Sequence, residues 1–360
     1  MSVPVAPADR VEALDVLRGV ALFGVLTVNL VTIFRVSLFQ EFLHGPEDAW
    51  ARAVSLGLEF KAVTLFSLLF GIGLEAQRQR IEGFRRYILR RLVFLLVVGL
   101  VHLFLVWNGD VLTLYALCGL VVAPLLRLPT RALLGLSILF FALQIAPVPY
   151  PPPFATAADL REHVDAAGHV YRHGTFVHVL TFRIAEVRPM GVLLLSIVPR
   201  TLGLFLLGAC VWRWNLLRGD RRVLAAIAIV GLAAGTYATM IGAAWASLVL
   251  AFGYGGAIVL AARPLCFLAP LGRMAFTCYL AQSFILSFVF YGWGLGQFGQ
   301  MSAANGILLA IAIYAAQAIA SALWLRRFRF GPLEWVWRSF SYGTARIAIT
   351  RARPPAAQVL

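Results

Sequence analysis

Residues 13–34 read ALDVLRGVALFGVLTVNLVTIF, an apolar run in which Asp15 and Arg18 are the charged residues. A helix of about 20 apolar residues, rising 1.5 Å per residue, spans the hydrocarbon core of a bilayer. The run is too long for the apolar region of a cleavable signal peptide, and Arg18 interrupts it. This stretch is therefore predicted to be a first membrane-spanning helix.

The composition of the whole chain supports the same interpretation. Of its 360 residues, 61% are hydrophobic and only 13% are charged, and the mean hydropathy is +0.84. Soluble domains carry roughly 25% charged residues, so a soluble globular protein is excluded. The net charge of +15 comes from short basic clusters between apolar stretches, so we expect a bilayer and no nucleic acid as partner. The four cysteines lie in apolar runs without CxxC spacing, and we predict no disulfide framework and no metal.

The hydropathy pattern predicts an all-α fold, a polytopic membrane helix bundle of about ten transmembrane helices. Residues 1–325 form this bundle and residues 326–360 form a cytoplasmic amphipathic tail. A window of about 19 residues marks the spans, which are residues 13–34, 51–76, 87–107, 110–127, 131–146, 190–212, 222–241, 244–262, 272–293 and 303–325.

Arginines cluster in alternate connections between these spans, and Lys61 is the chain's one lysine. Basic residues in short loops favour the cytoplasmic side of a membrane. We therefore predict that both termini are cytoplasmic and that the long connection at 147–189 is extracytoplasmic. The clustered arginines are Arg78, Arg80, Arg85, Arg86, Arg90, Arg91, Arg127, Arg131, Arg213, Arg218, Arg221, Arg222, Arg326, Arg327, Arg329 and Arg338.

The long connection carries most of the chain's histidines. Asp165, His169 and His173 are spaced four apart, so a helix there could aim all three at one metal ion. A run of prolines at 147–153 precedes them, and the segment is polar. We interpret it as a solvated cap over the bundle.

Three arginines fall within the predicted inner half of the spans: Arg18, Arg200 after Pro199, and Arg273. Charges at that depth are costly and require a partner or a function. The planar guanidinium fork is suited to phosphates, so these residues could bind a phosphorylated molecule from the cytoplasm. Alternatively they pair within the bundle, as Asp15 and Arg18 can across one helical turn.

The predicted outer half holds four other polar candidates: Asn29, Lys61, His102 and Asp110. His102 lies about 8 Å below the turn at 107–110, at 1.5 Å per residue. Asp110 either caps the next helix or orients His102. A carboxylate-oriented imidazole can remove a proton from a hydroxyl or amine near neutral pH. The same residues would also serve a proton relay in a transporter.

Five ordered motifs resemble the bacterial YeiB family, and the resemblance covers nearly the whole chain. They are Leu14-Asp-Val-Leu-Arg-Gly-Val-Ala-Leu-Phe-Gly-Val-Leu-Thr-Val-Asn29, Lys61-Ala-Val-Thr-Leu-Phe-Ser-Leu-Leu-Phe-Gly71, His102-Leu-Phe-Leu-Val-Trp-Asn-Gly-Asp110, Gly272-Arg-Met-Ala-Phe-Thr-Cys-Tyr-Leu-Ala-Gln282 and Gly331-Pro-Leu-Glu-Trp-Val-Trp-Arg338. Cys278 departs from the family pattern, which usually has asparagine there. The resemblance implies a bacterial cytoplasmic (inner) membrane protein.

The Asp-x-x-Arg-Gly opening is also remotely similar to that of heparan-glucosaminide acetyltransferase and other membrane-embedded acyltransferases. That resemblance implies transfer of an acyl group from cytoplasmic acyl-coenzyme A to an extracytoplasmic hydroxyl or amine, such as a sugar or glycolipid. The implied roles assign the acyl-CoA donor to Arg18, Arg200 and Arg273. His102 would act as the general base or as a transient acyl carrier, oriented by Asp110, and Lys61 and Asn29 would stabilise the oxyanion.

Two alternatives stay open from the sequence. His44, between the first two spans, is a second candidate for the catalytic histidine. A proton-coupled transporter or flippase could use Lys61, His102 and Asp110, with Pro199 breaking a helix. In the tail, arginines alternate with aromatic residues from Phe328 to Tyr342, so we expect it to lie along the inner membrane surface, with Glu334 paired to a nearby arginine.

Overall fold

The computed structural model describes residues 12–145, 154, 156–344 and 348–350. Within these residues the chain is helical, and it has no strand beyond an isolated bridge between Phe328 and Thr350. The predicted all-α class is confirmed. The elements are α1 (Glu12–Val28), η2 (Asn29–Phe34), α2 (Gln40–His44), α3 (Ala49–Gly57), α4 (Lys61–Arg80), α5 (Phe84–Val101), η3 (His102–Val106), α6 (Leu112–Leu125), α7 (Thr130–Ile145), α8 (Ala157–His173), α9 (Phe176–Ser196), α10 (Val198–Arg213), η4 (Leu216–Arg218), α11 (Arg221–Met240), α12 (Ala246–Leu260), η5 (Cys266–Leu268), α13 (Ala269–Arg273), α14 (Ala275–Phe290), α15 (Ala303–Arg327) and α16 (Pro332–Tyr342).

Five helical segments of the described chain are long and apolar enough to cross a membrane, and two bent helix pairs raise this number to seven. One pair is α9 with α10, bent by 46°, and the other is η5 and α13 with α14, bent by 76°. The other three predicted spans coincide with shorter apolar helices in α6, α7 and α12. A membrane protein is therefore indicated, with fewer full-length spans than the ten predicted.

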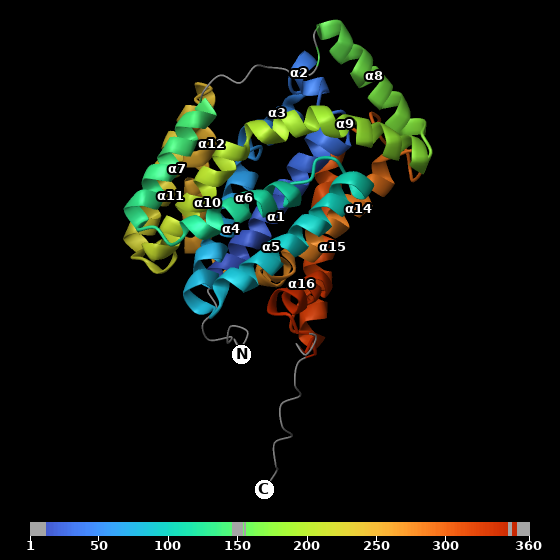
Figure 1. Ribbon diagram of the computed structural model, residues 1–360. Helices are drawn as coiled ribbons and strands as arrows, with labels where there is room; N and C mark the ends of the chain where they lie inside the picture. Colours follow the sequence, from blue (N-terminus) through green and yellow to red (C-terminus); the bar gives the residue numbers. More distant parts are fainter. Residues whose placement is uncertain (1–11, 146–153, 155, 345–347, 351–360) are drawn as a thin grey trace.

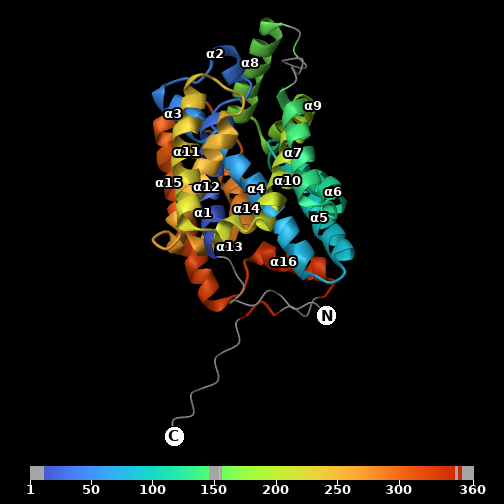
Figure 2. The same ribbon diagram turned by 90° about the vertical axis from the view of Figure 1, so that its left-hand side faces the viewer.

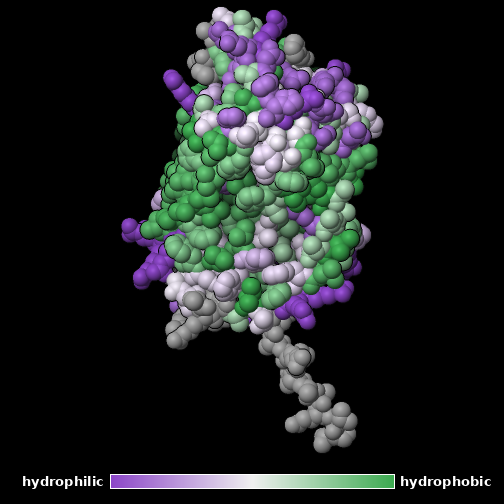
Figure 3. Space-filling model, turned by 90° about the vertical axis from the view of Figure 1, so that its right-hand side faces the viewer, coloured by the Kyte–Doolittle hydropathy of each residue, from purple (hydrophilic) through white to green (hydrophobic). Residues whose placement is uncertain are grey.

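The helices stand side by side in a bundle with two distinct ends (Figures 1 and 2). We call them the α8 end, where α2 and α8 lie, and the α16 end, where α16 crosses the bundle. The space-filling view shows a green apolar belt between purple hydrophilic ends (Figure 3). Such a belt matches the hydrocarbon layer of a bilayer, whose interior accepts helices with apolar surfaces.

The α16 end is tied together around one buried carboxylate. Glu75 of α4 is fully buried and accepts hydrogen bonds from Arg78 and from Arg213 of α10, with the shortest N–O distances at 2.7 and 2.9 Å. Arg213 also donates to the backbone carbonyls of Leu126 and Leu128. Since a buried charge is tolerated only when paired and hydrogen-bonded, this cluster locks α4, α10 and the α6–α7 turn together.

Two predicted boundaries differ from the structure. The connection at 147–189 contains α8 and the first part of α9, because the Thr156 hydroxyl and the Asp159 carboxylate form a capping box that begins α8. The tail does not start at 326, because α15 continues to Arg327. Beyond it, α16 packs against α5 and α14 and so forms part of the bundle.

Candidate functional site

His102 and Asp110 form a buried pair near the α8 end of α5. The helix becomes π-helical at His102, a distortion found frequently at functional sites. The imidazole Nδ1 lies 2.9 Å from Asp110 Oδ1, and the two side chains are 1% and 0% exposed. This burial excludes water from the pair, so the carboxylate holds the ring in one orientation.

The second oxygen of Asp110 caps α6. Oδ2 accepts a hydrogen bond of 2.7 Å from the Thr113 backbone N–H. The one carboxylate therefore makes the contacts that the two sequence interpretations require, one with the first turn of α6 and one with His102. Gly99 makes this packing feasible, because a Cβ there would lie 2.6 Å from the Thr113 nitrogen, closer than real contacts allow.

The other side of the His102 ring faces further buried polar atoms. His102 Nε2 and Thr113 Oγ1 are buried and make no hydrogen bond within the described part of the chain. The Tyr279 hydroxyl is also buried, and it lies beside the Val111 backbone. The rings of His102 and Tyr279 have centroids 5.5 Å apart, and Thr113 is held next to Asp110. Buried polar groups are normally hydrogen-bonded, so His102 Nε2 and Thr113 Oγ1 each have the capacity for a further hydrogen bond.

A second histidine–carboxylate pair lies on the other side of the turn that contains Asp110. Glu186 of α9 accepts hydrogen bonds from Asn108 at 2.8 Å and from the Tyr171 hydroxyl, and His163 Nε2 lies 2.8 Å from its other oxygen. Asn108, Tyr171 and Glu186 border a cavity of about 20 Å³. This cluster could not be predicted from the sequence, because Asn108 and Glu186 are 78 residues apart.

A larger cavity of about 280 Å³ opens at the α16 end. The first and the last helix of the described chain, α1 and α16, both contribute to its walls. Asp15 and Arg18, 3.3 Å apart, lie on one side. We call it the arginine cavity, after the five arginines that line it: Arg18, Arg80, Arg91, Arg273 and Arg338.

Aromatic side chains hold several of these arginines in place. The Arg91 guanidinium carbon lies 3.4 Å from the ring centroid of Trp337 in α16, and the Trp337 indole N–H donates to the Arg91 carbonyl. Arg338 lies over the Phe330 ring at 4.6 Å. Such cation–π contacts favour guanidinium groups fixed against ring faces, so the cavity presents positive charge from an ordered frame.

Glu334 anchors α16 to the bundle. Its Oε1 accepts the backbone N–H groups of Phe276 and Thr277 at 2.9 and 3.0 Å, and its Oε2 accepts the Thr277 hydroxyl at 2.6 Å. It thus caps the start of α14, and burial raises the pKa of its carboxyl. The predicted ion pair between Glu334 and an arginine is wrong among the described residues, because the orphan N–H groups of a helix start compete for the carboxylate.

The structure separates Arg200 from Arg18 and Arg273. Arg200 lies towards the α8 half, where it donates to Thr64 Oγ1 at 2.6 Å and to Ser247 Oγ at 2.7 Å. The reason is the bend at Ile197, which starts α10 at that level and lets it reach the α16 end only at Arg213. The predicted grouping of all three arginines around one donor is therefore not what the structure has.

Lys61 and Asn29 lie apart from the contacts of His102. Lys61 is buried and donates to the Ser55 carbonyl of α3 at 3.3 Å. Asn29 is half-buried where α1 becomes the π-helical η2. The aromatic neighbours of His102 come instead from η3 and α14, so the structure does not bring all four predicted outer residues together.

The remaining histidine candidates carry no metal cluster. His44 closes α2, and its side chain lies outside the described part of the structure. The rings of His169 and His173 are 5.6 Å apart on α8. Across the described residues, however, no three His, Cys, Asp or Glu side chains form a group that could hold a metal ion.

Comparisons with known proteins identify related chains over nearly the full length. Uncharacterized protein YxaH of Bacillus subtilis (strain 168) is 32% identical, with 94% of this chain and 96% of that protein aligned. Uncharacterized protein YeiB of Escherichia coli (strain K12) is 29% identical, with 95% and 99% aligned. A family model described as protein of unknown function (DUF418) matches residues 219–344, which run from just before α11 to just after α16. The family resemblance carried by the sequence motifs is confirmed: the chain belongs to the YeiB family.

Proposed function

We propose that this protein is a membrane-embedded acyltransferase of the bacterial cytoplasmic membrane. It moves an acyl group from cytoplasmic acyl-coenzyme A to an extracytoplasmic hydroxyl or amine on a sugar or glycolipid. The α16 end faces the cytoplasm in this proposal, because the arginine-rich connections lie at that end.

The arginine cavity is the observation that carries the proposal. Coenzyme A brings three phosphates and an adenine ring, and arginine forks bind phosphate oxygens in pairs. Arg18, Arg91, Arg273 and Arg338 border one space together with Trp337 and other rings. A cavity with this charge and these flat surfaces suits an adenine nucleotide better than it suits a neutral solute.

The placement of His102 relative to this cavity suits the shape of the same donor. Arg91 and His102 lie on one continuous helical element, α5 with η3, and the positions 91 and 102 are separated by about 16 Å at 1.5 Å per residue. In coenzyme A, the extended pantetheine arm separates the thioester from the phosphates. A donor held by its phosphates can therefore present its thioester towards His102.

The transfer needs one base and one leaving group. His102 Nε2 takes the proton from the acceptor hydroxyl or amine, whose oxygen or nitrogen forms the new bond to the thioester carbonyl carbon. The carbon–sulfur bond then breaks, and the departing sulfur takes up the proton from the imidazolium. Asp110 stabilises the charged ring through Nδ1–H. Lys61 donates to the Ser55 carbonyl of α3 and not to an atom of the His102–Asp110 pair.

The experiment is calorimetric titration of detergent-purified protein with acetyl-CoA and longer acyl-CoA esters. Removing one arginine that hydrogen-bonds a phosphate should cost about 1.5 to 3 kcal/mol, so Arg18→Ala and Arg273→Ala should each weaken binding about tenfold to a hundredfold. Arg200→Ala and the exposed Arg221→Ala serve as controls, and both should bind normally. Absence of acyl-CoA binding, or equal weakening in Arg221→Ala, would overturn the proposal.

A proton-coupled transporter or flippase is the second candidate. The sharp bends at Ile197 and Met274 favour it, because transporters place broken helices around their substrate sites. Proteoliposomes that move a fluorescent lipid or sugar without chemical change, while acyl-CoA stays intact, would favour this alternative.

A further inference from the structure

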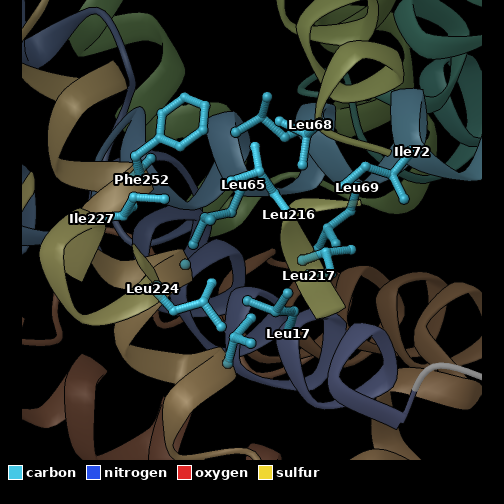
Figure 4. Close-up of a pocket in the computed structure, with 15 residues that line it drawn as sticks. Leu17, Leu65, Leu68, Leu69, Ile72, Leu216, Leu217, Leu224, Ile227 and Phe252 are labelled. Atoms are coloured by element: carbon cyan, nitrogen blue, oxygen red, sulfur yellow. The ribbon is translucent and has the colours of Figure 1, made fainter. Parts of the chain in front are cut away.

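An apolar groove of about 70 Å³ lies beside the arginine cavity. Its floor is a stripe of α4, Leu65, Leu68, Leu69 and Ile72, and its rim comes from η4, α11 and α12. The floor side chains are buried, whereas rim residues such as Phe252 are half-buried. Figure 4 shows the lining side chains converging on this space, with carbon atoms alone facing it.

The apolar groove and the arginine cavity are lined by consecutive residues of the same three helices. In each helix, one residue lines the groove and the next lines the cavity: Leu17 and Arg18 in α1, Ile72 and Gly73 in α4, and Val211 and Trp212 in α10. A Cβ added to Gly73 would lie 3.9 Å from an Arg18 guanidinium nitrogen. The groove and the cavity are therefore adjacent along three helices, with apolar surface in the groove and positive charge in the cavity.

The chemistry of the groove selects its occupant. The pantetheine arm of coenzyme A carries two amides, and burying an amide without hydrogen-bond partners costs free energy. An alkyl chain carries no polar group and so has no such cost. One water needs about 10 to 15 Å³ on the same measure, so the groove takes a segment of a chain, whose remainder stays among the bilayer lipids.

We propose that the groove and the adjoining edge of the cavity bind an anionic glycerophospholipid of the bilayer. A segment of one fatty chain lies in the apolar groove, and the phosphate lies at Arg18 and Arg80, where the cavity begins. Basic pockets between membrane helices bind anionic lipid headgroups in this way. The lipid phosphate shares Arg18 with the proposed acyl-CoA site, whereas the fatty chain lies in the groove, which the proposed acyl transfer does not use.

Gly255 of α12 offers a way to fill the groove without disturbing the backbone. It lines the groove, and a Cβ added there would make an ordinary contact of 3.5 Å with Leu65. Leucine is also a better helix former than glycine, so Gly255→Leu should fold. Gly135→Leu in α7 is the matched control, because Gly135 is exposed and a Cβ there would meet nothing within 4 Å.

Native mass spectrometry of protein exposed to equal amounts of phosphatidylglycerol and phosphatidylcholine tests the proposal. The parent protein should retain phosphatidylglycerol at least tenfold over phosphatidylcholine, Gly255→Leu should lose at least tenfold of it, and Gly135→Leu should keep it. Equal retention of the two lipids, or unchanged phosphatidylglycerol in Gly255→Leu, would overturn the site.

Acetyl-CoA titration of the same variants separates the two proposals. Gly255→Leu should bind acetyl-CoA as the parent protein does. If the parent protein binds no acyl-CoA, the acyltransferase proposal fails. The lipid site still stands in that case if the parent protein retains phosphatidylglycerol and Gly255→Leu loses it.

Discussion

Replacing His102 by asparagine should remove the proposed base while keeping the pair with Asp110. An asparagine amide nitrogen can take the place of imidazole Nδ1, so it can still donate to Asp110 Oδ1, which lies 2.9 Å from Nδ1. The side chain then has no counterpart of Nε2. The substitution therefore separates a role in chemistry from a role in holding α5 against α6.

General-base catalysis contributes typically 10²- to 10⁴-fold. At about 1.4 kcal/mol per tenfold, its loss raises the activation free energy by about 3 to 5 kcal/mol. Breaking a buried pair outright also costs about 3 to 5 kcal/mol, but in folding stability. Because the two figures overlap, the rate and the stability have to be measured on the same preparation.

The assay is release of the coenzyme A thiol from acetyl-CoA, with water or added glucosamine as acceptor, divided by the folded fraction from thermal unfolding. His102→Asn should fold nearly as well as the parent protein and release thiol 10²- to 10⁴-fold more slowly. His169→Asn is the control, since His169 is exposed on α8. If His102→Asn keeps its rate within about threefold per folded molecule, His102 is not the base.

Three further predictions concern stability. Glu75→Gln should lower the free energy of unfolding by about 3 kcal/mol or more, because Arg213 loses its buried charge partner; thermal unfolding checks this, with the exposed Glu82→Gln unchanged. Burial and the charge of Glu59 raise the pKa of Glu41 from 4.5 to about 7. Between these two values the folded state holds a proton that the unfolded state has released, so the free energy of unfolding should fall as pH rises from about 5 to 8. Glu41→Gln should reduce that fall in unfolding scans at the two pH values, and an unchanged slope would refute the assignment. Glu334→Ala should remove the cap of α14 and lower the free energy of unfolding by about 1 to 2 kcal/mol. It should also make the connection before α16 sensitive to limited proteolysis, whereas the parent protein should resist cleavage there.

Features encoded locally were predictable from the sequence. Apolar length is a property of consecutive residues, so each predicted span coincides with apolar helix. The pairing of His102 with Asp110 was also accessible, because both flank one tight turn. The position of Arg200 along the bundle axis was not predictable, because the bend at Ile197 determines where α10 starts. Pro199 signals that a break is near without fixing its side or angle.

Contacts between distant segments were beyond the sequence. Arg91 served there only as a marker of the cytoplasmic side, yet it lines the arginine cavity under Trp337, 246 residues away. Glu186 counted as a solvated loop charge, yet α9 buries it beside Asn108. Both placements depend on how helices far apart in the sequence pack together, and one amino-acid sequence alone carries no signal for that packing.

The rigid connection between the two sites constrains what each can contribute to a reaction. Arg91 and His102 share α5 and its π-helical extension, so their separation is fixed by the helix rise and not by a flexible loop. A group that binds phosphates about 16 Å from the reacting atoms interacts equally with the substrate and the transition state, and such uniform binding lowers KM without raising kcat. Replacing an arginine of the cavity should therefore raise KM at nearly constant kcat, whereas His102→Asn should lower kcat. A loss of kcat in both would mean that the phosphates are positioned for chemistry, and that the donor is held nearer to His102 than an extended pantetheine arm requires.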